Sequence, residues 1–462
     1  MIPKSAIPGV VWPAIPDAAG AMLLAILRQL DESEWLPAVE LEQRQTDALT
    51  RVLRHASETV AYYRDRPDYA AIAEEPALTA DDWRLLPVLT RADVQGAGTT
   101  LRSEALPKAH LPVAEVMTAG STGPPVKALA TAVTDLFWQA ITLREQLWHE
   151  RDLSGKLAAI RADLNGEVPP SGIALESWGP STGSVYRTGP CHLFSVRYDV
   201  AAQAEWLIAE DPDYLLTYPS NLAALARHFA DAGSRLPRLR QACTYGEVLS
   251  DHVRALCRRA WGVEVVDLYS TQELGYLALQ CPRTEQYHVQ AESVYLEVLD
   301  DDGQPCLPGE IGRVVATSLH NFAMPLIRYD LGDYAVVGPP CACGRGLPVL
   351  SAIIGRERNR WTMPQGERIW PLFSSREWAH IEAIRQLQLV QHRVDEVEAR
   401  IVGSRPLTTD EEAELTSRLR RRFDYPLKLS FTYLDDVART DGHKFEDFVS
   451  LVTDPDEASE SE

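Results

Sequence analysis

The sequence predicts an α/β protein with a large N-terminal domain of several subdomains, which combines mainly parallel sheets with a small β-rich part, and a small α+β C-terminal domain. Two patterns lead to this fold class. In the middle of the chain, short apolar runs alternate with helical stretches, which is typical of parallel strands covered by helices. Beyond Gly355, an alternating apolar and polar hairpin is followed by one amphipathic helix and one further strand.

The individual elements follow from periodicity. An amphipathic helix is predicted from Glu40 to Arg66, because apolar residues recur there at helical spacing. In the middle of the chain, the predicted strands are 157–160, 214–216 and 263–268, and the predicted helices are 222–232 and 251–261. The β-rich part begins with predicted strands at 293–299 and 312–317. In the C-terminal domain we expect a hairpin of 386–392 and 394–402, a helix opened by a capping box from Thr409 to Glu412, and a strand at 428–434.

The length and charge of the chain argue against a single-core protein and against one that binds nucleic acid or a membrane. A chain of 462 residues with 45% hydrophobic residues exceeds the size of one core, and a charged fraction of 24% is ordinary for globular proteins. The 45 basic and 66 acidic side chains give a net charge of −21, so we expect no nucleic-acid partner and no membrane partner. The sequence sets no oligomeric state, although a dimer would be compatible with it.

Two further features bear on the compartment. The apolar run from Ala18 to Leu27 is too short to span a bilayer, and it lacks the basic flank and cleavage site of a signal peptide. Seven cysteines are an odd number, and few for this length, which fits a reducing environment and not a disulfide framework. The sequence therefore predicts a cytoplasmic protein.

A glycine-rich segment from Val116 to Lys127, V-M-T-A-G-S-T-G-P-P-V-K, follows a strand-like stretch at 114–117. Glycines let backbone N–H groups surround phosphate oxygens, while hydroxyl groups add donors and a lysine adds positive charge. The segment lacks the G-K-[ST] ending of a Walker A loop. Taken alone, it fits a plain surface loop about as well as a phosphate site.

Further motifs follow in a fixed order. They are Tyr245-Gly246-Glu247, Asp267 to Glu273 (DLYSTQE), Gly309-Glu310-Ile311-Gly312, Arg328 to Asp333 (RYDLGD), Gly355-Arg356, and Arg439 to Lys444 (RTDGHK). With these motifs and the glycine-rich loop, the chain resembles the adenylate-forming superfamily of acyl- and aryl-CoA synthetases. Within that superfamily the chain is most similar to the phenylacetate-CoA ligase branch, through the helix ending at Tyr62-Tyr63, the segment Leu86 to Asp93 (LPVLTRAD), and the segment Cys341 to Pro348 (CACGRGLP).

The resemblance implies a role for each matching residue. Ser121, Thr122 and Gly123 would hold the phosphates of ATP, with Thr122 and Glu273 supporting Mg²⁺. Tyr269 would stack on adenine, within a nucleotide pocket that also includes Gly246, Glu247, Asp267 and Ser270. Asp333 and Arg328 would lie at the ribose, and Arg356 at the ribose or phosphate. Tyr245 and Gly275 would contact the acid, near the helix around Trp138. Lys444, Glu273 and Thr122 would be the catalytic residues, with Lys444 bridging the carboxylate and the α-phosphate.

Several positions depart from the pattern of the superfamily. Ser270 replaces the usual glycine, Gln272 the usual threonine, and His443 the usual glycine of the lysine loop. The acid expected at the hinge between the domains, just after Gly355-Arg356, is not obvious, because Arg358-Asn359 occupies the usual position and Glu357 stands one place early. The resemblance implies three parts: a nucleotide- and acid-binding domain at 1–355, a mobile domain at 356–453 that carries Lys444, and an acidic tail at 454–462 that is expected to be disordered.

A second group of residues has the composition of a metal site. Cys281 and His288 lie close in sequence, and Cys341 and Cys343 form a C-x-C pair. Together they would make a closed, structural Cys₃His zinc site. The alternative is a set of buried cysteines without a metal; a C-x-C pair in a cytosolic chain favours zinc over a disulfide.

The function implied by the resemblance is an ATP-dependent, AMP-forming ligase. It would adenylate a carboxylic acid, aromatic or cyclic by the same resemblance, and transfer the acyl group to CoA. Two alternatives remain at this point. One is a relative that uses an amine, an amino acid or a carrier-protein thiol as acceptor, and the other is a non-catalytic nucleotide-binding homologue. The presence of Glu273, Asp333 and Lys444 together argues against the second alternative.

Overall fold

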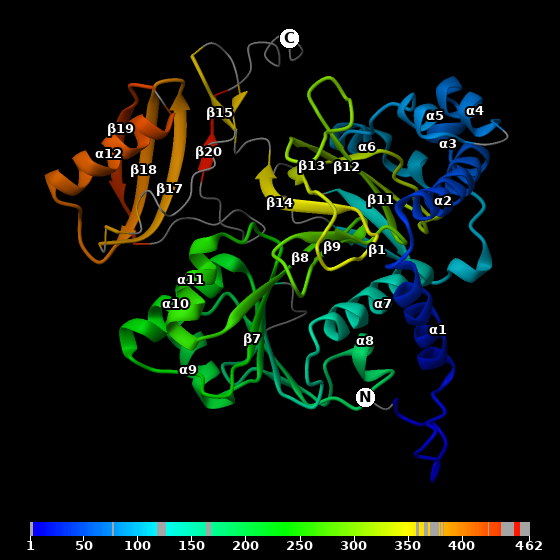
Figure 1. Ribbon diagram of the computed structural model, residues 1–462, viewed down its shortest axis with the longest axis horizontal. Helices are drawn as coiled ribbons and strands as arrows, with labels where there is room; N and C mark the ends of the chain where they lie inside the picture. Colours follow the sequence, from blue (N-terminus) through cyan, green and yellow to red (C-terminus); the bar gives the residue numbers. More distant parts are fainter. Residues whose placement is uncertain are drawn as a thin grey trace.

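The structure is a computed structural model, and it describes residues 3–75, 78–117, 126–162, 168–356, 360–364, 368–369, 378, 380–381, 383–423, 425–435 and 448–452. Figure 1 shows a large α/β body formed by the first three quarters of the chain and a smaller sheet with one long helix formed by the last quarter. No helix among the described residues combines the length and the apolar character needed to cross a membrane.

The N-terminal quarter is helical. It consists of α1 (Ala18–Ser33), α2 (Ala38–Thr59), α3 (Ala61–Arg64), α4 (Pro67–Ala73), α5 (Ala80–Arg84) and α6 (Arg91–Ala97), followed by the 3₁₀ turns η1 (Gly98–Leu101) and η2 (Lys108–His110). The helix predicted from Glu40 to Arg66 is therefore two helices, α2 and α3. They are separated at Val60, which has an extended backbone and forms a β-bridge with Ser103. A β-branched residue suits that conformation, and the bridge satisfies backbone groups that a continuous helix would use internally.

One twelve-stranded sheet organises the body, in the order β11-β12-β13-β14-β10-β9-β8-β7-β6-β3-β5-β4. Its parallel part consists of β5 (Cys191–Ser195), β3 (Leu157–Arg161), β6 (Tyr214–Thr217), β7 (Gln241–Tyr245) and β8 (Glu264–Thr271). The predicted strands at 157–160, 214–216 and 263–268 all lie in this part. Helices α9 (Val200–Glu210), α10 (Pro219–Ala232) and α11 (Asp251–Trp261) bury a continuous apolar core against these strands.

The remaining strands of this sheet are antiparallel. They are β4 (Ile173–Leu175), β9 (Gly275–Gln280), β10 (Tyr287–Val289), β11 (Val294–Leu299), β12 (Ile311–Ser318), β13 (Tyr329–Val337) and β14 (Val349–Arg356). The predicted strands at 293–299 and 312–317 correspond to β11 and β12. The β-rich part is thus hydrogen-bonded to the parallel part through β8 and β9, and the two form one mixed sheet. The fold class predicted from the sequence is confirmed.

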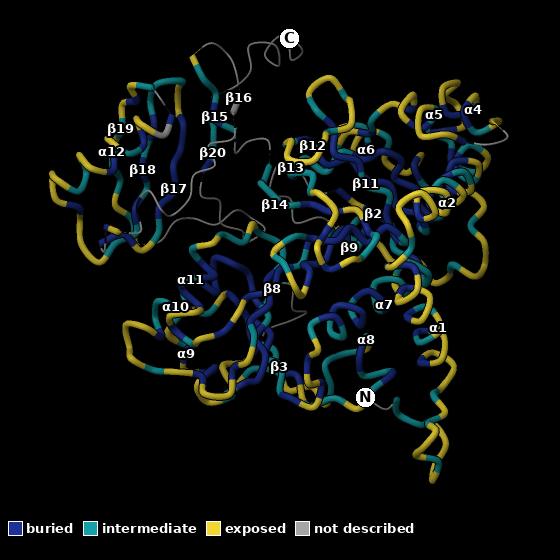
Figure 2. Tube along the Cα trace, in the orientation of Figure 1, coloured by how far each residue is buried: buried dark blue, intermediate teal, exposed yellow. Residues whose placement is uncertain are grey.

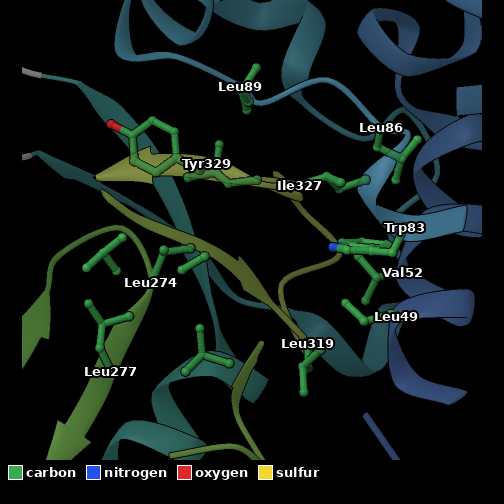
Figure 3. Close-up of a cluster of buried hydrophobic side chains, with 14 of the residues drawn as sticks. Leu49, Val52, Trp83, Leu86, Leu89, Leu274, Leu277, Leu319, Ile327 and Tyr329 are labelled. Carbon is green, nitrogen blue, oxygen red and sulfur yellow. The ribbon is translucent and has the colours of Figure 1, made fainter. Parts of the chain in front are cut away.

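Two helical layers hold the antiparallel part in place. Figure 3 shows Leu49 and Val52 of α2 and Trp83 of α5 packed with Leu319, Ile327 and Tyr329 in one buried cluster. A hairpin of β1 (Val113–Met117) and β2 (Lys127–Thr131) leads into α7 (Ala132–Trp148), which packs with α1 against β9, and the short α8 (Pro180–Gly183) follows β4. Figure 2 shows the strands of the sheet buried beneath these layers.

The C-terminal quarter has its own core. It contains β15 (Trp361–Thr362), β16 (Arg368–Ile369), β17 (Ile384–Arg393), β18 (Glu396–Gly403), α12 (Thr409–Phe423), β19 (Lys428–Tyr433) and β20 (Phe448–Ser450), with the four-stranded order β19-β18-β17-β20. The predicted hairpin is β17 and β18, and the predicted helix and strand are α12 and β19. The capping box lies one residue earlier than predicted, because the backbone N–H of Glu411 donates to Thr408 Oγ1 at 3.3 Å and that of Thr408 to Glu411 Oε2 at 2.8 Å.

Candidate active site

The parallel strands deliver several of the predicted residues to one edge of the sheet. Strands β3, β6, β7 and β8 run in the same direction, so their carboxyl ends meet, and ligands of open α/β sheets bind at such an edge. Tyr245 ends β7, and Gly246, with φ of 79°, turns the chain there. Tyr269 and Ser270 lie near the end of β8, and Glu273 follows it. This edge of the sheet therefore brings together two of the predicted motifs, Tyr245-Gly246-Glu247 and Asp267 to Glu273.

Three predicted residues are in direct contact at this edge. The hydroxyl group of Tyr269 donates to Asp333 Oδ2 at 2.9 Å, and Arg356 Nε lies 3.3 Å from Asp333 Oδ1. Asp333 and Arg356 are paired neighbours on β13 and β14. Burial, together with the negative charge of Asp333, raises the pKa of Tyr269 well above its usual value, so the phenol stays protonated and remains a donor. Residues from three separate motifs thus form one hydrogen-bonded unit.

Glu273 lies within electrostatic range of this unit. Burial raises the pKa of Glu273 above its usual value and the charge of Asp333 adds to the increase, while Arg356 and Arg91 lower it. A desolvated carboxylate beside a second carboxylate is a favourable ligand for a divalent cation, since the cation would compensate both charges.

Arg91 is a residue that the motif analysis missed as a participant in the site. It opens α6, directly after a segment that runs beside β13. The backbone N–H of Leu89 donates to the carbonyl of Arg328 at 2.9 Å, and that of Asp330 to the carbonyl of Leu89 at the same distance. The sequence analysis used the segment Leu86 to Asp93 only as a point of similarity to the ligase branch. The segment lies near the site because Leu89 is hydrogen-bonded to Arg328 and Asp330.

Glu247 has a defined structural partner. Its carboxylate accepts from the backbone N–H of Ser220 at 2.8 Å and from Ser220 Oγ at 3.0 Å, at the first turn of α10. This is the favourable position for an anion at a helix N-terminus. Next to it, the ring of Tyr245 lies 4.9 Å from that of Tyr218, and the guanidinium of Arg161 lies 5.8 Å from the Tyr245 ring. Arg161, at the end of β3, is a further cation at this edge that the motifs did not indicate.

Gly275 and Trp138, which the sequence analysis assigns to the acid-binding part, lie next to each other. Gly275 begins β9 with φ of 81°, and a Cβ atom at this position would lie 3.7 Å from Trp138 Cε3. The Trp138 ring packs at 4.4 Å from that of Tyr276. Ile141, one turn further along α7, is buried in the core beneath.

Two of the residues predicted to contact the nucleotide have buried partners within the protein. Asp267 is buried within the sheet, where it accepts from Thr244 Oγ1 at 2.7 Å and from the hydroxyl of Tyr287 at 2.9 Å. Burial raises its pKa to about 6, and these bonds make the side chain a polar group of the core.

The second of these residues is Arg328. Its guanidinium forms a buried ion pair with Glu297 at 3.0 Å and donates to the carbonyls of Arg84 and Leu86. These bonds use four of its five N–H donors, and through them Arg328 joins the N-terminal helices to β11.

Other predicted residues lie outside the described part of the chain. They are Ser121, Thr122 and Gly123 of the phosphate loop, Glu357 to Asn359 at the expected hinge, His443 and Lys444 of the lysine loop, and the acidic tail at 454–462.

The predicted metal ligands meet in one cluster. The ligand atoms of Cys281, His288, Cys341 and Cys343 all lie within 4.8 Å of one another. Cys341 Sγ is 3.7 Å from Cys281 Sγ, and Cys343 Sγ is 3.3 Å from His288 Nε2. A tetrahedral zinc ion with Zn–S bonds of about 2.3 Å separates its sulfur ligands by about 3.8 Å, so these distances fit the edges of such a site. Burial lowers the pKa of His288 to about 4, which keeps the imidazole neutral as a metal ligand requires.

Comparisons with known proteins agree with this geometry. A family model described as the CapK C-terminal domain matches residues 362–450. Phenylacetate-coenzyme A ligase of Thermus thermophilus is 23% identical over 411 residues, which cover 84% of this chain and 86% of that protein. Phenylacetate-coenzyme A ligase of Escherichia coli is 24% identical over 416 residues, which cover 85% of this chain and 90% of that protein.

The fold also matches a solved structure. The crystal structure of 2-hydroxyisobutyryl-CoA ligase, in the postadenylation state and in complex with 2-HIB-AMP, superposes with a TM-score of 0.71 at 20% identity and covers 93% of both chains. The chain is therefore similar to phenylacetate-coenzyme A ligases over most of its length, and its fold is that of 2-hydroxyisobutyryl-CoA ligase.

Proposed function

We propose that this protein joins a carboxylic acid to coenzyme A at the expense of ATP, through an acyl-adenylate. The observation that carries the proposal is the unit of Tyr269, Asp333 and Arg356 beside Glu273, at the carboxyl edge of the parallel strands. This unit offers an aromatic face for a base, a carboxylate for ribose hydroxyls and a second carboxylate for a cation. The homology to phenylacetate-coenzyme A ligases supports the same activity.

In the first half-reaction, a carboxylate oxygen of the acid attacks the α-phosphorus of ATP, and the bond to pyrophosphate breaks. Tyr269 would stack on adenine, Asp333 would accept from the ribose hydroxyls, and Arg356 would balance the charge of Asp333. Mg²⁺, when bound by Glu273 and Thr122, would neutralise the charge of the leaving pyrophosphate. Lys444 would hold the attacking carboxylate against the α-phosphate.

In the second half-reaction, the thiol sulfur of coenzyme A attacks the acyl carbon and loses its proton, and AMP leaves. A domain at 356–453 that reorients about its junction with 1–355 would expose a different face to each half-reaction. Two observations support a boundary at this point. The C-terminal core cluster draws its residues only from Trp361 to Phe448, and the family match begins at residue 362.

The acid is proposed to be aromatic or cyclic. The curated relatives are phenylacetate-coenzyme A ligases, and Trp138 and Tyr276 place two aromatic rings beside Gly275. We place the protein in the cytoplasm, since none of its seven cysteines forms a disulfide.

Pyrophosphate exchange with a panel of aryl and alkyl acids tests the first half-reaction, and detection of the acyl-CoA thioester tests the second. Exchange with an acid without thioester formation would favour the alternative acceptors, an amine, an amino acid or a carrier-protein thiol. Measurable ATP binding without exchange for any acid would favour a non-catalytic homologue. Lys444→Ala is expected to lower exchange at least about 100-fold. Lys428→Ala is the matched control, because Lys428 is an exposed lysine of the same part of the chain, paired with Asp395 at 2.7 Å.

We further propose that the cluster of Cys281, His288, Cys341 and Cys343 binds one structural zinc ion. With four protein ligands the ion would have no open position, so its contribution would be to stability and not to catalysis. Elemental analysis of the purified protein should find one zinc per chain, none in Cys343→Ser, and one in the control Cys306→Ser, whose thiol lies outside the cluster. Wild-type protein that is fully active and contains no metal would refute this proposal.

A further inference from the structure

The N-terminal loop, residues 5–16, is an apolar projection that the proposed function does not use. Figure 1 shows it extending from the body beyond the start of α1, and Figure 2 shows most of it exposed. The exposed fractions are 47% for Ile7, 74% for Val11, 76% for Trp12 and 51% for Ile15. Met22, on the outer face of α1, continues this surface with 56% exposed.

The loop is held in shape by its own hydrogen bonds. At its base, the backbone N–H of Ala6 donates to the carbonyl of Ile15 at 2.7 Å, and that of Ile15 donates to Ser5 Oγ at 3.3 Å. The backbone N–H of Lys4 ties the loop to the body through the carbonyl of Val185 at 2.7 Å. The apolar side chains are therefore presented on a closed loop whose base is fixed, which lowers the entropy lost on binding.

The charge distribution distinguishes this surface from the rest of the chain. Between Lys4 and Arg28 there is one charged residue, Asp17, although 24% of the chain is charged. The carboxylate of Asp17 is used at the N-terminus of α1, where it accepts from the backbone N–H of Gly20 at 2.8 Å. Depletion of charge around an exposed tryptophan is typical of the centre of a protein interface.

A cavity lies directly beside the loop. It has a volume of about 470 Å³, and its walls are formed by residues of 3–11 together with 151–154 and 186–187. Trp12 does not line this cavity. The segment 151–154 immediately precedes β3, so the cavity lies at the amino edge of the parallel strands, opposite the candidate active site.

We propose that this surface is the interface of a homodimer, in which the loop and α1 of one copy contact the same elements of the second copy and Trp12 enters the cavity of its partner. A two-fold interface requires a surface that complements itself, and here an exposed indole and residues that line a cavity belong to the same loop. The net charge of −21 favours a second copy of the chain over an anionic membrane as the partner of this surface. Two copies of so acidic a chain repel one another least where charged residues are sparse, as along this loop, whereas a membrane of anionic lipid would be repelled by the chain as a whole.

The exposed area is of the right size for such a contact. With full side-chain areas of roughly 200 Å² each, the exposed fractions of Ile7, Val11, Trp12, Ile15 and Met22 amount to on the order of 600 Å². A stable interface buries about 800 Å² on each partner, so these side chains would supply most of it.

Sedimentation equilibrium of the full chain over a range of concentrations tests the proposal. The wild-type protein should approach twice its mass of 51.4 kDa. The double substitution Val11→Ser with Trp12→Ser should weaken dimerisation at least about 30-fold. Leu85→Ser is the matched control, because Leu85 is 72% exposed just after α5, outside this surface, and the dissociation constant of this variant should change less than about twofold.

Three results would overturn the proposal. The first is a wild-type chain that remains at 51.4 kDa at every concentration. The second is a double variant that dimerises as tightly as the wild type, which would move the interface elsewhere. The third is a monomer that floats with phosphatidylcholine vesicles through this loop, which would assign the surface to lipid. Pyrophosphate exchange by the double variant should equal that of the wild type, so a failure of the proposed function would not be confused with a failure of the dimer.

Discussion

Asp333→Ala gives a quantitative test of the nucleotide site. In the structure this carboxylate accepts one hydrogen bond from Tyr269 at 2.9 Å and pairs with Arg356 at 3.3 Å, and it would also accept from the ribose hydroxyls. A hydrogen bond to a charged acceptor contributes about 1.5 to 3 kcal/mol, and screening at this partly exposed site favours the lower end for each hydroxyl. Loss of both should cost about 3 kcal/mol, which corresponds to a rise of roughly 150-fold in KM for ATP.

The assay is pyrophosphate exchange as a function of nucleotide concentration, with ATP and with 3′-deoxyATP. The wild type should discriminate against 3′-deoxyATP by about tenfold or more, because one hydroxyl is missing, and Asp333→Ala should discriminate hardly at all. Asp330→Ala is the matched control: it lies on the same strand, but its carboxylate pairs with Arg313 at 3.3 Å, so KM for ATP should stay within about twofold of the wild type. If Asp333→Ala keeps the full discrimination, the ribose is recognised by other groups and the reasoning fails.

Three further predictions concern buried and partly buried charges. Arg328→Met should lower the free energy of unfolding, measured by urea denaturation, by about 3 to 5 kcal/mol, because it leaves Glu297 buried without this partner. The control Arg313→Met removes a more exposed ion pair and should cost about 1 kcal/mol or less. Equal losses in the two variants would contradict the structural role of Arg328. The pKa of Asp267 is raised in the folded state from 3.8 to about 6, so the native protein holds this proton longer than the unfolded chain, and stability should fall by up to about 3 kcal/mol as pH rises from 4 to 6. Asp267→Asn should flatten that part of the stability profile, and an unchanged profile would refute the shift. Glu273→Gln should raise the Mg²⁺ concentration for half-maximal exchange by about tenfold or more, whereas an unchanged requirement would remove Glu273 from the cation site.

Periodicity predicted the secondary structure well where a helix or strand is amphipathic and bounded by strong signals. Helix α11 begins at Asp251 and ends at Trp261, as the sequence indicates. Helix α10 begins three residues before the predicted range, at Pro219, where a proline fits the first turn without losing a hydrogen bond. The capping box of α12 was ambiguous in sequence, because Thr408 with Glu411 and Thr409 with Glu412 have the same spacing; only the backbone geometry selects the first pair.

Motif order located the site but could not say which side chains face it. Asp267 and Tyr269 are two residues apart on β8 and share a face of the strand, yet Asp267 lies about 7 Å further from the carboxyl edge and is enclosed by the sheet. The partner of Arg328 is 31 positions away in sequence, on a strand that pairs only in the folded chain. Arg91 and Arg161 escaped notice for the same reason, since their proximity to the site arises from pairing between distant segments.

The cluster of Cys281, His288, Cys341 and Cys343 was the opposite case. The chemistry of thiol and imidazole groups is specific enough that four residues spread over two segments could be grouped from sequence, and the structure brings their ligand atoms within 4.8 Å.

Helix α1 sets a lower limit on how short this protein can be made. Its C-terminal Glu34 is shared by two cations, with Arg345 at 3.0 Å and the buried Arg144 of α7 at 3.7 Å, and it accepts from Trp148 Nε1 at 2.8 Å. A chain that starts at Asp17 would lose the projecting loop and keep this network. A chain that starts after Glu34 would leave Arg144 with Glu292 as its remaining carboxylate, at 2.8 Å, and would deprive the cysteine-bearing segment of its anchor on the helical layer. Natural or engineered shortening of this fold should therefore stop before α1, and removal of the loop ahead of it should cost only the proposed dimer contact.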